Sequence, residues 1–298
     1  MKFDIVILGS GPAGLAAALY SGRAGRSVSV LGGMPGGQMG RIAHLENYPG
    51  AMGEVSGRKL AEIMKNQAVT FGAEFMPGLA VEMKKGIGSY FIKTSLGQEV
   101  EGRVVIIATG ASPRKLGIPG EAEFEGKGVS FCATCDGAFY KGLDVMVVGG
   151  GNSALSEALH LSHIAKSVVI SYRKAEFTLP EKVLIDRVIA TPNIRIEFNS
   201  ELAEILGGEF VEKVQFKDGG EVKVDGVFLA IGHVPNTEFL PEGWIKDGAG
   251  HIVTELNRMQ IRGEGVFVCG DVRSESVKQV VIAAGQGAQA AMEANDWL

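Results

Sequence analysis

The chain lacks long apolar runs, cysteine-rich segments and clusters of basic residues. No apolar stretch in its 298 residues reaches the roughly 18 that a transmembrane helix needs, and the N-terminal MKFDIVILGSG is too short and wrongly flanked for a secretory signal. Three cysteines cannot form the disulfide framework of a secreted domain. A net charge of −5 without any Lys/Arg run disfavours nucleic acids and anionic membranes as partners. We therefore expect a cytoplasmic protein with no nucleic-acid or membrane partner.

Glycine, by contrast, is abundant. The chain has 43 glycines but no collagen-like repeat and no Ser/Gln-rich tract, so we expect the glycines at defined turns. Hydrophobic residues make up 46% of the chain and charged residues 21%, as in a globular protein. Its length suits two domains of ordinary size.

The N-terminus combines a buried-type strand, a glycine-rich turn and a helix. Residues 3–8 are an apolar run, Gly9-Ser-Gly11-Pro-Ala-Gly14 follows, and residues 15–20 are strong helix formers. In a dinucleotide-binding turn the first glycine permits the tight turn, the second lets a pyrophosphate approach, and the third lets the helix pack on the strand. A chance match is the alternative, but the strand–turn–helix context favours nucleotide binding. The next strand ends in Gly32-Gly33 instead of the usual acidic residue, which leaves the site open to a dinucleotide other than NAD.

The same pattern returns in the middle of the chain. Residues 143–148 are typical of a buried strand, Gly149-Gly-Gly151-Asn-Ser-Ala154 of the turn, and residues 155–161 of the helix. Alanine at the third position still allows close helix–strand packing. Two copies of the pattern are stronger evidence for dinucleotide binding than one copy, because each supports the other as a duplicated unit.

Two further strands suggest where one copy interrupts the other. The apolar runs 104–110 and 226–232 end in small-residue turns and are followed by Pro113 and Pro235, as expected of linkers. We therefore predict an α/β fold with two three-layer, Rossmann-like dinucleotide-binding domains, one inserted in the other. The predicted domains are residues 1–111 with 236–298, and residues 112–235.

Cys132 and Cys135 are two residues apart and directly precede Asp136. A metal site needs two further ligands, but Cys269 lies in a buried-type strand and the five histidines (44, 160, 163, 233 and 251) show no paired spacing. A purely structural disulfide is disfavoured in the cytoplasm. A CxxC pair can close a short disulfide and lower the pKa of one thiol, and Asp136 adds an acid–base group. The pattern indicates redox catalysis and no metal.

Together these motifs resemble the low-molecular-weight thioredoxin reductases, flavoprotein disulfide reductases with two dinucleotide domains. The similarity runs from Phe3 to Trp297. It is carried by GSGPAG (9–14), PGGQM (35–39), ENYPG (46–50), ATG (108–110), CATCDG (132–137), GGGNSA (149–154), IGHVPN (231–236), CGDV (269–272) and Lys278-Gln279. The resemblance implies an FAD-dependent enzyme that reduces thioredoxin or a glutaredoxin-like protein and that forms a homodimer.

The resemblance also implies roles for the matching residues. Cys135 is expected next to the flavin, Cys132 is expected to attack the partner's disulfide, and Asp136 to donate and accept the proton. Cys135 cannot contact the flavin while Cys132 contacts a bulky protein partner. The resemblance therefore implies that the inserted domain rotates. The residues expected to bind FAD are Gly9, Ser10, Gly11, Pro12, Ala13, Gly14, Gly37, Gln38, Asn47, Thr109, Gly110, Gly270, Asp271, Lys278, Gln279 and Val280. Those expected at the second nucleotide are Gly149, Gly151, Asn152, Ser153, Ala154 and Arg173. Taken singly, Gln38, Asn47 and Lys278 also fit solvated loop positions.

The chain departs from this family at the NADPH signature, HRRxxxR. Ser171 and Tyr172 stand in place of the His and the first Arg, and only Arg173 matches. The spacing puts the last Arg at Phe177, and neither this residue nor the neighbouring Thr178 and Leu179 is basic. Bidentate arginines are the natural ligands of the 2′-phosphate, so a preference for NADPH is doubtful. Either NADH binds loosely, with Tyr172 able to stack on the adenine, or electrons come from another donor such as ferredoxin or a deazaflavin. The cofactor is thus FAD, with NADH and NADPH both open.

Two other functions fit parts of the sequence. A dithiol oxidase would run the same cysteines in reverse with dioxygen as the final acceptor, which suits a weakened nicotinamide site but not the intact GGGNSA turn. A non-catalytic flavin redox sensor needs no proton shuttle, so Asp136 argues against it. The disulfide reductase is therefore the main hypothesis.

Overall fold

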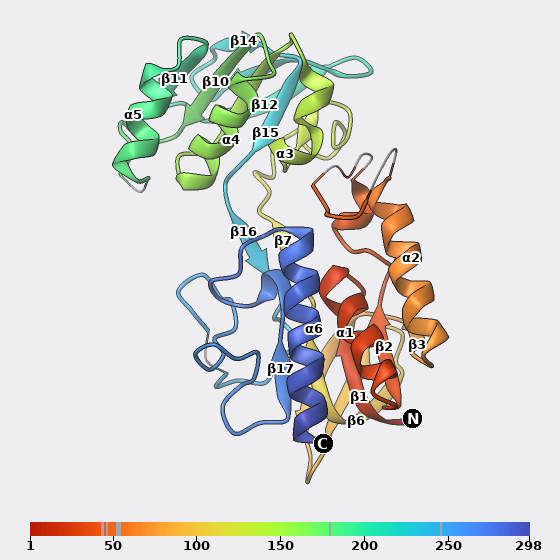
Figure 1. Ribbon diagram of the computed structural model, residues 1–298. Coiled ribbons are helices and arrows are strands. Elements are labelled where there is room, and N and C mark those ends of the chain that lie inside the picture. Colours follow the sequence, from red (N-terminus) through yellow and green to blue (C-terminus); the bar gives the residue numbers. More distant parts are fainter. Residues whose placement is uncertain (43–44, 46, 52–54, 179, 245) are drawn as a thin grey trace. The chain divides into compact units, whose positions relative to one another are not determined.

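Figure 1 shows the computed structural model, which describes residues 1–42, 45, 47–51, 55–178, 180–244 and 246–298. His44, Glu46 of the ENYPG motif and Leu179 lie outside the described residues. The chain divides into two compact units: residues 1–112 with 234–298, and residues 113–233. The predicted boundaries, after residues 111 and 235, lie next to these crossings.

The first unit is built on a seven-stranded sheet with the order β3-β2-β1-β6-β5-β4, in which β17 also pairs with β6. The pairs among β1, β2, β3, β6 and β17 are parallel, whereas β4 and β5 are antiparallel. The strands are β1 (Lys2–Leu8), β2 (Val28–Gly32), β3 (Glu74–Pro77), β4 (Ala80–Lys85), β5 (Tyr90–Thr94), β6 (Glu99–Ile107) and β17 (Val266–Val268). The helices are α1 (Pro12–Arg23), α2 (Gly57–Thr70) and α6 (Val280–Trp297), with 3-10 turns η1 (Met39–Arg41) and η3 (Gly270–Val272).

Alternating side chains of β1 separate two cores. Ile5 and Ile7 pack with α1 and α6, while Val6 and Leu8 pack on the opposite face of the sheet. This alternation follows from the two-residue period of a strand, and burial on both faces is expected of parallel strands.

Helices α1 and α6 lie side by side in this unit (Figure 1). Small residues allow the contact: a Cβ added at Gly287 of α6 would lie 2.0 Å from the backbone oxygen of Ala13. A Cβ added at Gly270, just before α6, would meet the Ala13 side chain at 3.0 Å. This packing holds the start of the C-terminal helix and η3 beside the first glycine turn.

The second unit has a parallel sheet with the order β11-β10-β9-β15-β8 and an antiparallel sheet with the order β12-β13-β14. Its strands are β8 (Val129–Ser130), β9 (Asp144–Val148), β10 (Ser167–Tyr172), β11 (Ile194–Phe198), β12 (Leu202–Gly207), β13 (Val211–Phe216), β14 (Glu221–Lys223) and β15 (Gly226–Leu229). Its helices are α3 (Ala133–Asp136), α4 (Asn152–Ser162) and α5 (Lys182–Ala190), with the 3-10 turn η2 (Gly137–Tyr140).

The second unit has three layers. Val145 and Val147 of β9 pack with α4, whereas Met146 packs with Val214 of β13 on the opposite face. The parallel sheet therefore lies between a helical layer and the antiparallel sheet. This is the predicted α/β class with two Rossmann-like domains, each with a parallel sheet at its centre.

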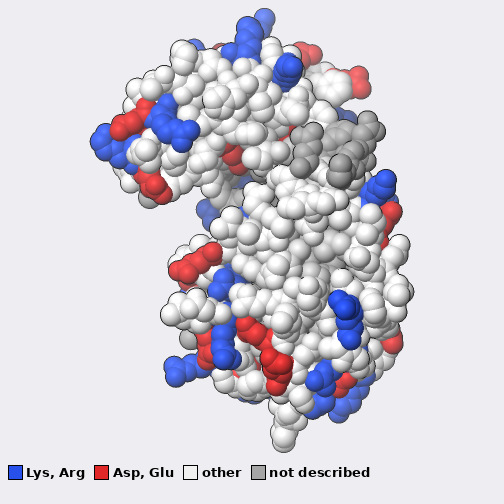
Figure 2. All heavy atoms as spheres, viewed as in Figure 1, with Lys and Arg blue, Asp and Glu red and all other residues white. Residues whose placement is uncertain are grey.

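Two short strands mark the crossings between the units. β7 (Ala111–Pro113) pairs with β16 (His233–Pro235), and the Arg114 amide donates to the Gly232 carbonyl at 2.9 Å. None of the helices in the described part of the chain is long and apolar enough to cross a membrane. On the face drawn in Figure 2, acidic and basic side chains are interspersed.

Candidate active site

The first glycine turn of the chain lies between β1 and α1. Gly9 has a φ of +113°, and a Cβ there would lie 2.2 Å from the Ala108 carbonyl oxygen. A Cβ at Gly14 would lie 1.9 Å from the Gly9 oxygen. Gly11 differs from both, because nothing lies within 4 Å of a Cβ built on it. Gly9 and Gly14 are therefore required by the fold, whereas Gly11 leaves open space.

That open space lies at the N-terminus of α1. Gly11 is the N-cap, no side chain caps the helix and no acidic residue stands in its first turn. The amide groups of such a helix end carry a partial positive charge and bind anions. The turn can therefore hold a phosphate group of a ligand.

A second glycine loop of the first unit folds back onto this turn. The Gly36 amide donates to the Ser10 carbonyl at 2.7 Å, and the Ser10 hydroxyl donates to the Met34 carbonyl at 3.2 Å. A Cβ at Gly37 would lie 3.3 Å from the Gly11 Cα. The Gln38 side-chain amide donates to the Ala111 carbonyl. The sequence separates these two loops, but the structure brings them together.

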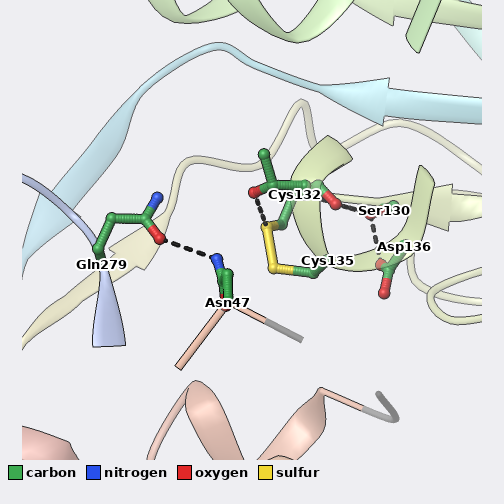
Figure 3. The surroundings of a disulfide bond; sticks show 7 residues. Asn47, Ser130, Cys132, Cys135, Asp136 and Gln279 are labelled. Atoms are coloured by element: carbon green, nitrogen blue, oxygen red, sulfur yellow. Dashed lines mark hydrogen bonds between the residues drawn. A yellow bond between two sulfur atoms is a disulfide. The ribbon is translucent and has the colours of Figure 1, made fainter. Parts of the chain in front are cut away.

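The C-terminal motifs come to the same unit. The side-chain amide of Asn47 donates to Gln279 Oε1 at 3.1 Å, directly before α6 begins at Val280 (Figure 3). Asp271 lies in η3, where burial raises the pKa of its carboxyl and the Lys278 ammonium opposes the shift. A carboxylate held partly out of water is stabilised by hydroxyl donors, such as those of a sugar.

The ATG motif of residues 108–110 is tied to the second crossing. The Thr109 hydroxyl donates to the Asn236 carbonyl at 2.7 Å, and the Asn236 side-chain amide donates to the Thr109 carbonyl at 2.8 Å. The Asn236 amide donates to the Gly110 carbonyl at 3.0 Å. These contacts fix the backbone at the edge of the first unit where β6 ends.

The second glycine turn, between β9 and α4, repeats the first in part. Gly149 has a φ of +145°, and a Cβ there would lie 2.4 Å from the Ala230 oxygen. Gly151 is the N-cap of α4 and has open space around it. Asn152 is engaged with Glu181, whose amide donates to Asn152 Oδ1 at 2.8 Å. Ser153 is exposed and Ala154 is buried beneath the turn.

Tyr172 makes this turn differ from the first. A Cβ at Gly150 would lie 2.2 Å from Cδ2 of the Tyr172 ring, so the ring packs directly on the turn. Tyr172 is buried and stacks on Phe177 with ring centroids 5.5 Å apart. Ser171 is also buried, with its hydroxyl 2.8 Å from the Ser200 hydroxyl. The expected availability of Tyr172 for adenine stacking does not agree with this packing, because the ring already lies between Gly150 and Phe177.

The basic side chains after β10 have a different environment. Arg173 and Lys174 are exposed, as is Thr178. Arg173 is therefore the one exposed cation at a position of the NADPH signature.

Cys132 and Cys135 form a disulfide at the start of α3 (Figure 3). Cys132 is the N-cap of this short helix, and its Sγ lies 3.4 Å from the exposed Thr134 hydroxyl. The amides of Cys135 and Asp136 donate to the Cys132 carbonyl at 3.2 and 3.1 Å. Both cysteines are partly exposed. The pair can therefore exchange with another thiol or disulfide.

Ser130 links the disulfide to Asp136, a contact that the sequence did not reveal. Its hydroxyl donates to Asp136 Oδ2 at 2.6 Å and accepts the Cys132 amide at 3.1 Å (Figure 3). Burial, with the Asp136 charge as a smaller cause, raises the pKa of the nearby Tyr140 to about 12. Tyr140 therefore stays neutral near neutral pH, and Asp136 is the carboxyl that Ser130 links to the pair.

The described part of the chain offers neither a metal site nor a reactive thiol outside the Cys132–Cys135 pair. No three of its His, Cys, Asp and Glu residues lie close enough to hold a metal ion. The third cysteine, Cys269, is fully buried, and burial raises the pKa of its thiol to about 12. Thiol chemistry near neutral pH therefore belongs to Cys132 and Cys135 alone.

Known proteins are similar to this chain over nearly its full length. The family model described as pyridine nucleotide-disulphide oxidoreductase matches residues 3–287. The chain is 40% identical to a thioredoxin reductase of Rickettsia felis, over 99% of this chain and 97% of that one, and 40% identical to one of Treponema pallidum with the same coverage. The crystal structure of a thioredoxin reductase from Streptococcus pyogenes is 37% identical, covers 99% of this chain and 98% of its own, and has a TM-score of 0.87.

Proposed function

This chain belongs to the pyridine nucleotide-disulphide oxidoreductase family, and we propose that it passes electrons from a donor through FAD to the Cys132–Cys135 pair. From the pair, the electrons go to the disulfide of a small redox protein, thioredoxin or a glutaredoxin-like protein. The enzyme class is a flavoprotein disulfide reductase of the thioredoxin reductase type. The observation that carries the proposal is the partly exposed disulfide on α3, linked through Ser130 to Asp136.

The exchange with the partner needs one attack by each cysteine. Asp136 takes the proton of the Cys132 thiol, and the resulting thiolate attacks one sulfur of the partner's disulfide. A mixed disulfide forms, and the second partner sulfur leaves as a thiolate that takes the proton back from Asp136. The Cys135 thiolate then attacks the Cys132 sulfur, which restores the Cys132–Cys135 disulfide and expels the first partner sulfur as a thiolate that takes a proton from solvent. The Ser130 hydroxyl, 2.6 Å from Asp136, holds that carboxyl next to the pair.

The first unit fits FAD at two points. The open space at Gly11, at an uncapped helix N-terminus, suits the pyrophosphate, and the partly buried Asp271 carboxylate suits a ribose or ribityl hydroxyl. Gln38, Asn47 and Gln279 are oriented by hydrogen bonds to other parts of the same unit, and we assign them to the flavin. FAD, when bound, supplies a two-electron store between the donor and the disulfide.

Gly11→Val is expected to lower the FAD content at least about tenfold, the equivalent of ~1.4 kcal/mol of binding free energy. The Gly11 backbone has an ordinary φ of −73°, and no protein atom lies within 4 Å of a Cβ built there, so we expect the apoprotein to fold normally. Gly248→Val is the matched control, because Gly248 is also open and lies in an exposed loop. FAD per chain and the thermal midpoint of the apoprotein check the result. Full FAD content in Gly11→Val would contradict the assignment.

The packing of Tyr172 supports a donor site without NADPH preference. An arginine at this position could bind the 2′-phosphate, but a tyrosine buried against Gly150 and Phe177 offers no cation. Each charge-assisted hydrogen bond to a phosphate contributes roughly 1.5–3 kcal/mol, so two missing arginines weaken NADPH binding by at least about 10². NADH makes no such contact and loses nothing.

We therefore expect NADPH to reduce the flavin no better than NADH does. The test is an anaerobic titration with NADH, NADPH and dithionite, followed at the flavin band, with oxidised thioredoxin and a glutaredoxin added as acceptors. Efficient turnover with micromolar NADPH and poor turnover with NADH would contradict the donor proposal. Failure of both acceptors after dithionite reduction would contradict the proposed function itself.

Thr178→Arg is expected to raise the efficiency with NADPH about tenfold and to leave NADH unchanged, because a cation here, one residue after the last signature position at Phe177, provides one charge-assisted contact to the 2′-phosphate. Thr178 is exposed, so the fold tolerates the longer side chain, which a change at the buried Tyr172 does not ensure. Thr178→Gln, of similar length without the charge, is the control. An equal gain in both variants or with both nucleotides would argue against phosphate recognition.

A further inference from the structure

Glu157 of α4 places a carboxyl group behind the disulfide helix. Helix α4 packs against α3, and the backbone amide of Ala133, between the two cysteines, donates to the Glu157 carboxyl. The other carboxyl oxygen, Oε2, is buried and has no hydrogen-bond partner among the described residues. The exchange described above does not use this group.

Burial raises the pKa of Glu157 to about 7, and the hydrogen bond from the Ala133 amide partly opposes the shift. No neighbouring charge is among the causes. Other titratable or charged side chains lie on α4 and on the elements around it. On the helical side they are His160 on α4, Asp136 on α3, Tyr140 on η2, and Lys182, Asp186 and Arg187 on α5. On the sheet side they are Asp144 on β9, Tyr172 on β10, and Arg195 and Glu197 on β11. Glu157 therefore changes its charge near neutral pH because of burial.

A purely structural role does not account for this carboxyl. An unpartnered buried oxygen is unfavourable, and a glutamine would accept the Ala133 amide equally well. What a glutamate adds is a negative charge that can be removed by one proton. That charge lies at the Ala133 amide in the first turn of α3, the short helix that carries the sulfur atoms on which charge develops during exchange.

We propose that Glu157 is a positioning residue that couples the redox pair to pH, taking up a proton when the Cys132–Cys135 disulfide is reduced and releasing it when the disulfide forms again. This inference rests on the proposed function only in that the pair is redox-active. Two electrons break the S–S bond, one sulfur takes a proton and becomes a thiol, and the other remains a thiolate. The Glu157 carboxylate then takes one proton from solvent, because two like charges close together are unfavourable.

The direction of the effect follows from the charge of Glu157. Well below pH 7 the carboxyl is neutral, and Glu157→Gln should reduce as readily as the wild type. Well above pH 7 the ionised carboxylate opposes the thiolate, so the wild-type disulfide should be harder to reduce than that of Glu157→Gln. The expected difference there is about tenfold in the reduction equilibrium constant, the effect of one like charge on a neighbouring titration.

The test is an anaerobic equilibrium of the purified FAD-containing protein with a dithiol–disulfide redox buffer, from about pH 5 to about pH 9. Samples are quenched with acid and their free thiols are counted. The ratio of the Glu157→Gln and wild-type equilibrium constants should rise from one to about ten around pH 7. Because the assay uses neither the electron donor nor the protein acceptor, its outcome is separate from that of the proposed function.

Two further variants complete the experiment. Glu209→Gln removes an exposed carboxylate of the same unit and should follow the wild type at every pH. Glu157→Asp keeps a titrating carboxyl, so the ratio of its equilibrium constant to that of the wild type should stay near one well below and well above pH 7. Glu157→Leu also removes the charge and should show the same rise as Glu157→Gln, which preserves the test if the glutamine variant fails to fold. Superimposed curves for wild type and the variants without the charge, an offset that is equal at every pH, or a rise in Glu157→Asp as large as that in Glu157→Gln would overturn the proposal.

Discussion

Replacing either Cys132 or Cys135 with serine is expected to reduce protein-disulfide turnover to background while FAD remains bound. Both sulfur atoms are needed, because one must attack the partner and the other must resolve the mixed disulfide, and a serine hydroxyl does neither at neutral pH. The FAD contacts assigned above lie in the first unit, whereas the pair belongs to the second. Turnover with a protein disulfide and FAD per chain measure the two parts separately.

Cys269→Ala is the matched control, since it removes the third thiol, which is buried and outside the pair. It should retain turnover. The two serine variants should also differ from each other. Cys135 is the thiol assigned to the flavin side, so a long-wavelength thiolate–flavin absorption band is expected in Cys132→Ser and not in Cys135→Ser. Full turnover in either serine variant would refute the exchange mechanism.

Asp136→Asn is expected to slow turnover by about 10² or more, the usual contribution of a positioned acid–base group. Asparagine can still accept the hydrogen bond from the Ser130 hydroxyl, which donates to Asp136 at 2.6 Å, but it cannot hold the transferred proton. Steady-state turnover with a saturating protein disulfide measures the loss, and the FAD spectrum verifies that the fold is intact.

Ser130→Ala separates the proton transfer by Asp136 from the orientation of its carboxyl by the Ser130 hydroxyl. It leaves the Asp136 carboxyl in place and removes the hydroxyl that orients it, so its loss should be smaller, about tenfold. If Asp136→Asn turned over at the wild-type rate, Asp136 would have only a structural role in α3. If Ser130→Ala lost as much as Asp136→Asn, the hydrogen bond and not the proton would be the important feature.

The fold was predictable from the sequence where local signals agree. The run of residues 3–8 and the glycines after it belong to β1 and the turn before α1, because a buried strand and a tight turn are both specified by adjacent residues. The return of the pattern at residues 143–154 likewise predicted β9 and α4. The antiparallel sheet β12-β13-β14 had no comparable signal, since its alternation is short and partly polar.

The site was less predictable, because its details depend on contacts between distant residues. The sequence shows Tyr172 in place of an arginine, but only the fold shows its ring packed on Gly150. Ser130 and Asp136 are six residues apart and meet because α3 turns back on β8. Glu157 stands among the buried apolar positions of α4, and a polar residue on such a face was the one available signal.

The pairing of β7 with β16 has a consequence for how the chain folds. β6 and β17 are neighbours in the sheet of the first unit, yet the whole second unit lies between them in sequence. As an unfolded loop, this segment would oppose their pairing through its chain entropy. Once the second unit has folded, its two ends are held together at β7 and β16, and it acts as a short, closed connection. The inserted unit should therefore fold early, and its folding should accelerate the completion of the first.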